Sequence, residues 1–259
     1  MASLDFPKLE KEISQKFKIY SKTPEYHLKR KKSGSSNMTS KKYTDEWMIE
    51  HPNMQKLLIS IKNSKKSKTN KKKEITLKKE IKEGKTRIKT AWRNLKEVNL
   101  NKIGLNHTIL LNLGKDIDEY NESYRRQRVS LGMHYTPPNP LKVYQLLNNF
   151  FEEYNNFKGS KLELGLLSHV VIGGIQPFYD GNKRCARMIQ NKTLAENHLP
   201  IVSIPYGERK IYISLLEEAM KGLNFYNEMP EHNKENFDKL FTYLGGKINT
   251  SLDNIIKNI

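Results

Sequence analysis

The stretch from residue 162 to residue 194 most constrains the fold, because a polar turn containing glycine separates two apolar segments. Residues 162–175 are nearly all apolar, which predicts a buried helix. Residues 176–187 read Gln-Pro-Phe-Tyr-Asp-Gly-Asn-Lys-Arg-Cys-Ala-Arg, and apolar residues then return at helical spacing. The pattern therefore predicts two helices joined by a short loop, with Gly181 and Asn182 at the start of the second helix.

The start of that second helix has the composition of an anion-binding site. Free backbone N–H groups and the positive end of the helix dipole meet there. Arg184 and Arg187 are three residues apart, so both can point toward one bound polyphosphate. Asp180 is the hard oxygen ligand that a magnesium ion bridging phosphates prefers.

This run resembles the signature of the Fic (Fido) family, His-Pro-Phe-x-Asp/Glu-Gly-Asn-Gly-Arg-x-x-Arg. Gln176 stands at the position of the family's catalytic histidine, and Lys183 replaces a glycine, as in a Gly-Asn-Lys-Arg variant of the loop. The resemblance implies a mainly α fold: a Fic-like helical core with a small β-hairpin flap, over about residues 85–245. The matching positions are Pro177, Phe178, Asp180, Gly181, Asn182, Arg184 and Arg187.

The resemblance also implies ATP or another nucleoside triphosphate, with magnesium, as cofactors. It implies magnesium binding by Asp180 and a core position for Phe178, and Lys183 adds a cation beside the phosphates. The target would be a protein bearing a Ser, Thr or Tyr hydroxyl, which docks on a flap within residues 124–138. The implied phosphate-binding residues are Gly181, Asn182, Lys183, Arg184 and Arg187, and the implied flap residues are Val129, Ser130, Leu131 and Gly132.

Two further residues have two interpretations each. Glu83 is the nearest candidate for the family's inhibitory glutamate, although Lys79 departs from that pattern and an ordinary exposed helix glutamate is the alternative. Tyr212 either faces a nucleotide base or packs in the core. His169 lies two helical turns before Gln176, and we expect it to pack in the core rather than to act as a base.

Gln176 changes the expected chemistry. In the family, the histidine takes a proton from the target hydroxyl while that oxygen attacks a nucleotide phosphate. A glutamine amide can hydrogen-bond the hydroxyl but cannot hold its proton, and loss of a general base costs on the order of a hundred- to ten-thousand-fold in rate. The chain is therefore a slow transferase, a pseudoenzyme that serves as a binding module, or a substituted form of an active parent. A fourth interpretation is a basic nucleic-acid-binding protein.

The charge distribution predicts three regions. Residues 1–100 contain 27 Lys or Arg against 11 Asp or Glu, whereas residues 101–259 contain 19 against 17. We expect a basic extension over 1–84 that is mobile in part, a Fic-like domain over 85–245, and a C-terminal helix over 246–259 after a break at Gly245-Gly246. Within the extension, residues 62–73 hold seven lysines and no acid, which predicts a solvated linker or a polyanion-binding arm.

Composition also indicates a compartment. The single cysteine, Cys185, excludes an internal disulfide, and we expect it to be buried. No apolar run reaches the length of a membrane span. We therefore expect a soluble cytoplasmic protein, in its own cell or in a host's, while the lysine run is also compatible with a nuclear address.

Overall fold

The computed structural model describes residues 6–23, 68–131, 135–224, 231–232 and 234–258, and almost all of them lie in helices or connecting loops. The mainly α prediction is confirmed. No helix of the described part is both long and apolar enough to cross a bilayer. The elements are α1 (Phe6–Tyr20), α5 (Lys68–Glu97), α6 (Leu100–Ile103), α7 (His107–Ile117), η1 (Pro140–Lys142), α8 (Val143–Asn156), α9 (Lys161–Ile175), α10 (Asn182–Glu196), η2 (Tyr206–Glu208), α11 (Arg209–Lys221), β1 (Leu223–Asn224), β2 (Glu231–His232) and α12 (Lys234–Ile256).

Helix α9 is the centre of the core. All its residues are buried except Lys161 and Glu163 near its start, as expected of a helix that is apolar on every side. Its first turn is capped by Ser160, whose hydroxyl accepts a hydrogen bond from the Glu163 N–H at 3.0 Å. The buried helix expected over 162–175 is therefore present with almost the same bounds.

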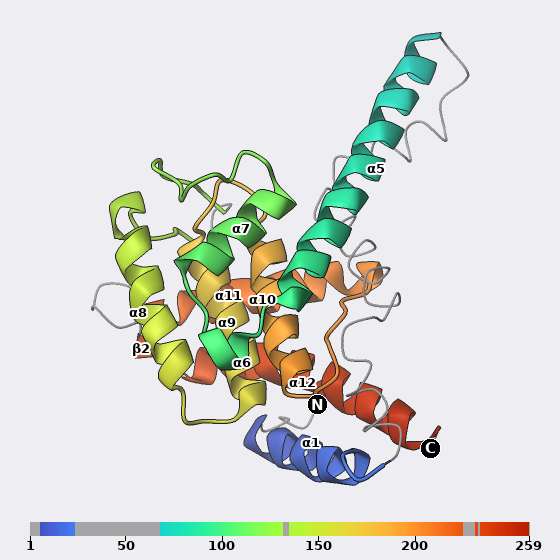
Figure 1. Ribbon diagram of the computed structural model, residues 1–259, viewed down its shortest axis with the longest axis vertical. Helices are drawn as coiled ribbons and strands as arrows, with labels where there is room; N and C mark the ends of the chain where they lie inside the picture. The colour runs from blue at the N-terminus through green and yellow to red at the C-terminus, as the bar shows by residue number, and fades with distance from the viewer. Residues whose placement is uncertain (1–5, 24–67, 132–134, 225–230, 233, 259) are drawn as a thin grey trace.

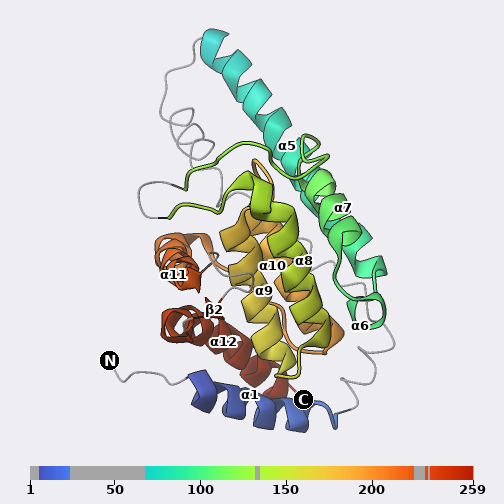
Figure 2. The same cartoon turned by 90° about the vertical axis from the view of Figure 1, so that its left-hand side faces the viewer.

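The other helices surround α9 in a globular bundle (Figure 1). Helices α8, α10, α11 and α12 contact α9 directly, and α7 and α5 form a further layer beyond α10. Figure 2 shows α1 lying across the end of the bundle, against α12. Only β1 and β2 form strands among the described residues, as a two-residue antiparallel pair.

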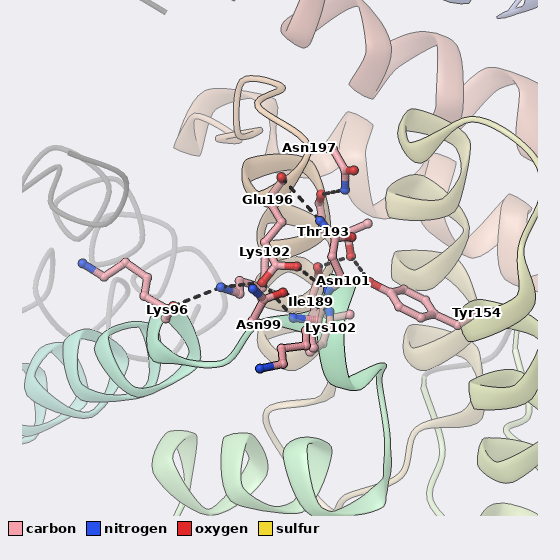
Figure 3. Close-up of polar contacts among 11 residues, drawn as sticks. Lys96, Asn99, Asn101, Lys102, Tyr154, Ile189, Lys192, Thr193, Glu196 and Asn197 are labelled. Carbon is pink, nitrogen blue, oxygen red and sulfur yellow. Dashed lines mark hydrogen bonds and ion pairs between the residues drawn. The ribbon is translucent and has the colours of Figure 1, made fainter. Parts of the chain in front are cut away.

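A buried ion pair at the far end of α10 fixes the chain that links α5 to α6 (Figure 3). Lys192 Nζ lies 2.8 Å from Glu196 Oε1 and donates to the Lys96 carbonyl in the last turn of α5, at 3.0 Å. The Glu196 carboxylate accepts the N–H groups of Leu100 and Asn101, at 2.8 and 2.9 Å. The cation thus faces the negative end of one helix dipole and the anion the positive end of the next.

The two ends of the described chain pack together. Helix α1 buries Phe6, Leu9 and Ile13, and a Cβ on Gly245 of α12 would lie 3.1 Å from a Leu9 methyl. Helix α12 runs without interruption through Gly245-Gly246, so the predicted helix break was wrong. Gly245 allows close approach of α1, and that packing offsets its low helix propensity of about 1 kcal/mol.

The lysine-rich segment also differs from its prediction. Residues 68–73 belong to the first turns of α5, not to a linker, because the long helix continues beyond the turns that pack on the core. The boundary predicted at residue 84 falls inside this helix. Residues 24–67, which include most of the expected mobile segment and the rest of the lysine run, lie outside the described residues. The three-region division stays a prediction.

Candidate active site at the turn between α9 and α10

The loop begins where Gln176 ends helix α9. Its backbone is left-handed, with φ of 52° and ψ of 62°, while its N–H still bonds the Ile172 carbonyl at 3.2 Å. The side chain is buried, and its amide nitrogen donates to the Gly173 carbonyl. Its amide oxygen accepts from Asn182 Nδ2 at 3.0 Å. Both polar ends of Gln176 are therefore bonded to the protein's own loop and helix.

Asn182 closes the loop on itself. Its Oδ1 accepts the Phe178 N–H at 2.7 Å, and its Nδ2 also donates to the Phe178 carbonyl at 2.8 Å. The Phe178 ring is fully buried, and it packs so tightly on α7 that a Cβ on Gly114 would lie 2.3 Å from it. The loop is consequently anchored by one aromatic ring and one amide.

The start of α10 is open to an anion. Gly181 precedes the helix with φ of 80° and has no side chain with which to cap it, and its N–H donates to Asp180 Oδ1 at 2.6 Å. A Cβ there would lie 2.8 Å from the Ile117 side chain, so glycine is required by both conformation and space. The first N–H groups of a helix have no intrahelical partner, which leaves this end suited to phosphate oxygens.

Two buried arginines and one exposed acid lie at this helix start. Arg184 is 5% exposed and donates to the carboxylate of Asp180 at 2.8 Å, whereas Asp180 is 61% exposed. Arg187 is equally buried and donates to Tyr212 Oη at 3.2 Å. Lys183 is half-buried on the same turn. Removing two guanidinium groups from water raises the electrostatic attraction of the site for an anion.

A buried chain of hydrogen bonds continues from Arg187. Tyr212 Oη lies 2.9 Å from His169 Nε2, and His169 Nδ1 lies 2.5 Å from Gln190 Oε1. Since the Gln190 oxygen can only accept, Nδ1 carries the proton and Nε2 accepts from the tyrosine. Tyr212 is thus a buried core residue that also positions Arg187, and His169 is a buried histidine, as expected.

The comparisons with known proteins agree with this geometry. The model of the Fic/DOC family matches residues 98–194. Residues 98–194 belong to the Fic/DOC family.

Curated relatives share stretches of similar length with this chain. The protein adenylyltransferase Fic of Drosophila willistoni is 33% identical over 102 residues, which are 38% of this chain and 20% of that protein. A probable protein adenylyltransferase of Aquifex aeolicus is 32% identical over 103 residues, 39% of this chain and 32% of that protein. The chain thus spans only a fifth to a third of the length of these relatives.

Solved structures with the same fold cover nearly the whole chain. A Fic domain containing signaling protein from Bacteroides thetaiotaomicron superposes with a TM-score of 0.65 at 18% identity, over 94% of both chains. Fic-1 of C. elegans, residues 134–508, superposes with a TM-score of 0.67 at 16% identity, over 98% of this chain and 72% of that one. At these identities the likeness establishes the fold.

The described residues of the segment predicted to form a β-hairpin flap are built differently from the prediction. Residues 121–131 and 135–139 form no strands, and residues 132–134, with Gly132, lie outside the described residues. Instead of a strand ladder, Arg125 holds this segment. Its guanidinium donates to the carbonyls of Ile175, Gln176, Gln127 and Pro138, at 2.6–3.3 Å, and its N–H to that of Pro177 at 2.8 Å. Val129 and Leu131 are half-buried, and Ser130 is exposed.

Sequence reasoning missed two side chains that support the loop. Arg125 is one of the largest fully buried side chains, although its neighbours in sequence are polar and give no signal of burial. Asn121, also buried, donates from Nδ2 to the carbonyls of Asp180 and Gly114, at 2.9 and 3.3 Å. Both side chains bond to backbone carbonyls of segments that are distant in sequence, and such contacts produce no local sequence pattern.

The remaining candidate, Glu83, lies outside this cluster. Glu83 is exposed on α5, 3.8 Å from the ammonium of Lys79, so its inhibitory role stays a prediction. Cys185 is fully buried in the first turn of α10. The described residues contain no group of three His, Cys, Asp or Glu side chains that could hold a metal ion.

Proposed function

We propose that this Fic domain binds a magnesium–nucleoside triphosphate at the start of α10, and that its transfer of AMP to a target hydroxyl is impaired by Gln176. The observation that carries the proposal is the loop itself. Two buried arginines and an uncapped helix start surround it, while the position of the family's base holds a buried amide. The adenylyltransferase relatives support ATP as the nucleotide.

Each group has a distinct task in this proposal. The N–H groups that follow Gly181 and the guanidinium groups of Arg184 and Arg187 would bind the phosphate oxygens. Lys183 would add a cation beside them. Magnesium commonly binds through one or two carboxylates together with substrate phosphates, and the exposed carboxylate of Asp180 fits that role. When bound, the ion would neutralise phosphate charge.

The proton of the target hydroxyl limits the reaction. As the hydroxyl oxygen bonds to the α-phosphorus, the bond to pyrophosphate breaks and the hydroxyl proton must leave. Gln176 cannot take it, and the nearby His169 is bonded through both ring nitrogens. The proton would pass to solvent or to a phosphate oxygen, which is a slow path at neutral pH.

Nucleotide transfer by a Gln176→His variant tests the impairment. With labelled ATP and magnesium, we expect auto-modification or target modification to rise by about a hundred- to ten-thousand-fold over the wild type. The matched control, Gln176→Ala, also breaks the bonds of the amide but supplies no base, and it should stay at the wild-type rate. A rapid wild-type rate that survives in Gln176→Ala would show that another group is the base.

A binding module without catalysis is the second candidate, because both polar ends of Gln176 are already bonded within the protein. In that case nucleotide would bind by calorimetry, yet Gln176→His would remain inactive. Arg184→Ala separates both candidates from a site that binds no nucleotide, since it should weaken binding at least tenfold. Equal affinity in wild type and Arg184→Ala would exclude the anion site.

Target docking and location follow from the same proposal. A target protein would dock on the segment that contains Val129, Ser130 and Leu131, next to the loop, and present a Ser, Thr or Tyr hydroxyl. We further propose a cytoplasmic protein, in its own cell or in a host's. The lysines of residues 62–73 would make, at most, a separate contact with a polyanion.

A further inference from the structure

Helix α5 carries one continuous row of cations. At about 100° per residue, six side chains fall within about 80° of arc along the helix. The acids of α5 whose side chains are described, Glu80, Glu83 and Glu97, lie about 80–180° around the helix from the middle of that row. The six residues, here called the cation row, are Lys78, Lys82, Lys85, Lys89, Arg93 and Lys96.

The row flanks the buried face of α5. That face contains Ile88, Ala91, Trp92 and Leu95, is centred about 110° around the helix from the middle of the row, and packs on α7 and α10. Two acids near α5 pair with cations outside the row: Glu83 with Lys79, and Glu119 with Arg87 at 2.6 Å.

The middle of the row is unpaired. Lys82, Lys89 and Arg93 are exposed and Lys85 is half-buried. None of these four forms an ion pair with any residue that the structure describes. Four neighbouring cations without counter-charges repel one another, and a bound polyanion would relieve that repulsion.

The shape of α5 matches a double helix. Figure 1 shows α5 projecting out of the bundle. From Lys78 to Lys96 the row spans about 27 Å, which equals about eight base pairs at 3.4 Å each. An α-helix is about 10–12 Å across, so it can also enter a major groove about 12 Å wide.

Other anionic surfaces fit less well. A membrane-bound amphipathic helix inserts an apolar face, but the apolar face of α5 is already buried in the fold. Proteins that bind single strands stack bases on aromatic side chains, and the row contains none. We propose that α5 binds the phosphate backbone of a double-stranded nucleic acid through the cation row, without base specificity. This surface is separate from the nucleotide loop and does not depend on its activity.

Fluorescence anisotropy with the full chain tests the proposal. The probes are two labelled 20-base-pair DNA duplexes of unrelated sequence, titrated at 50, 100 and 200 mM NaCl. The variant is Lys82→Gln, Lys85→Gln, Lys89→Gln and Arg93→Gln combined, since glutamine keeps a similar helix propensity. The control changes Lys11, Lys18, Lys158 and Lys257 to Gln, which lowers the net charge equally at exposed sites outside α5.

We expect both duplexes to bind the wild type equally. In a plot of log affinity against log salt concentration, each phosphate contact should contribute about −0.9 to the slope. The slope of the row variant should therefore be shallower than that of the wild type by about 3–4. The row variant should also bind at least tenfold more weakly at 100 mM, while the control stays within about threefold of wild type and circular dichroism is unchanged in both.

Four results would overturn the proposal. Equal loss in the row variant and the control would reduce the effect to net charge. An unchanged row variant would exclude the row. Absence of duplex binding at 50 mM NaCl would show that the cation row has no nucleic-acid ligand. Likewise, displacement of the duplex by polyglutamate at equal charge concentration would favour an acidic protein as the partner.

Discussion

At the scale of single residues, the site is held by groups that bond to backbone carbonyls. Gln176 and Asn182 close the loop from within, while Arg125 and Asn121 hold it from the preceding segment. Because most of these contacts do not use the side chain at position 176, we expect the loop to keep its shape when that side chain is replaced.

Tyr212→Phe tests the chain of bonds behind Arg187. Removing Oη leaves Arg187 and His169 without that partner, so we expect nucleotide affinity to fall by about three- to tenfold, or about 1 kcal/mol. Titration calorimetry measures this. Tyr154→Phe is the matched control, because it removes a buried hydroxyl bonded to Thr193 at 2.6 Å, toward the other end of α10. Equal affinity in the two variants would show that Tyr212 does not position Arg187.

Residues of the loop were predictable from sequence, whereas their supports were not. Gly181, Asn182 and Phe178 follow a fixed local spacing that identifies the turn. Arg125 and His169 act through partners 50 and 21 residues away, and a single sequence does not pair such positions.

At the scale of helices, the two ends of α10 have different structural roles. Its first turn forms the candidate site, and its last turn fixes α5 and α6 through Lys192 and Glu196 (Figure 3). Helix existence was predictable from apolar periodicity. The continuity of α12 through two glycines was not, because tertiary packing outweighed local propensity.

Glu196→Gln tests the contribution of the Lys192–Glu196 ion pair in the last turn of α10. The substitution leaves the buried Lys192 ammonium without its counter-charge, so we expect the free energy of unfolding to fall by about 2–4 kcal/mol. Urea denaturation measures this. The control is Glu218→Gln, which breaks an exposed pair with Lys239 and should cost less than about 1 kcal/mol.

If a buried charge is the cause, adding Lys192→Met to Glu196→Gln should recover part of the loss. A double variant no more stable than the single one would instead assign the loss to the amides of Leu100 and Asn101.

At the scale of the whole molecule, the fold includes a segment outside the family match. Helix α1 packs on α12 through a salt bridge between Lys16 and Asp253 at 2.6 Å and through buried apolar side chains. Residues 6–20 of the basic extension are thus part of the bundle. The apolar residues of α1 recur at helical spacing, but the sequence does not show which helix they contact.

Ile13→Ala tests this packing. Ile13 is 1% exposed, and truncating it should lower the free energy of unfolding by about 2–4 kcal/mol. Ile19→Ala is the control on the same helix, since Ile19 is 56% exposed and should change stability by less than about 0.5 kcal/mol. Similar small effects in both variants would mean that α1 is detached in solution.

Because Cys185 is buried, thiol labelling can measure local opening of the first turn of α10. A thiol reagent has one possible target in this chain, and that target is sealed beneath the first turn of α10. Labelling can proceed only while that turn is transiently open, so its rate gives the free energy of local opening. Protection that rises with added nucleotide would then measure occupancy of the loop directly, without any assay of transfer.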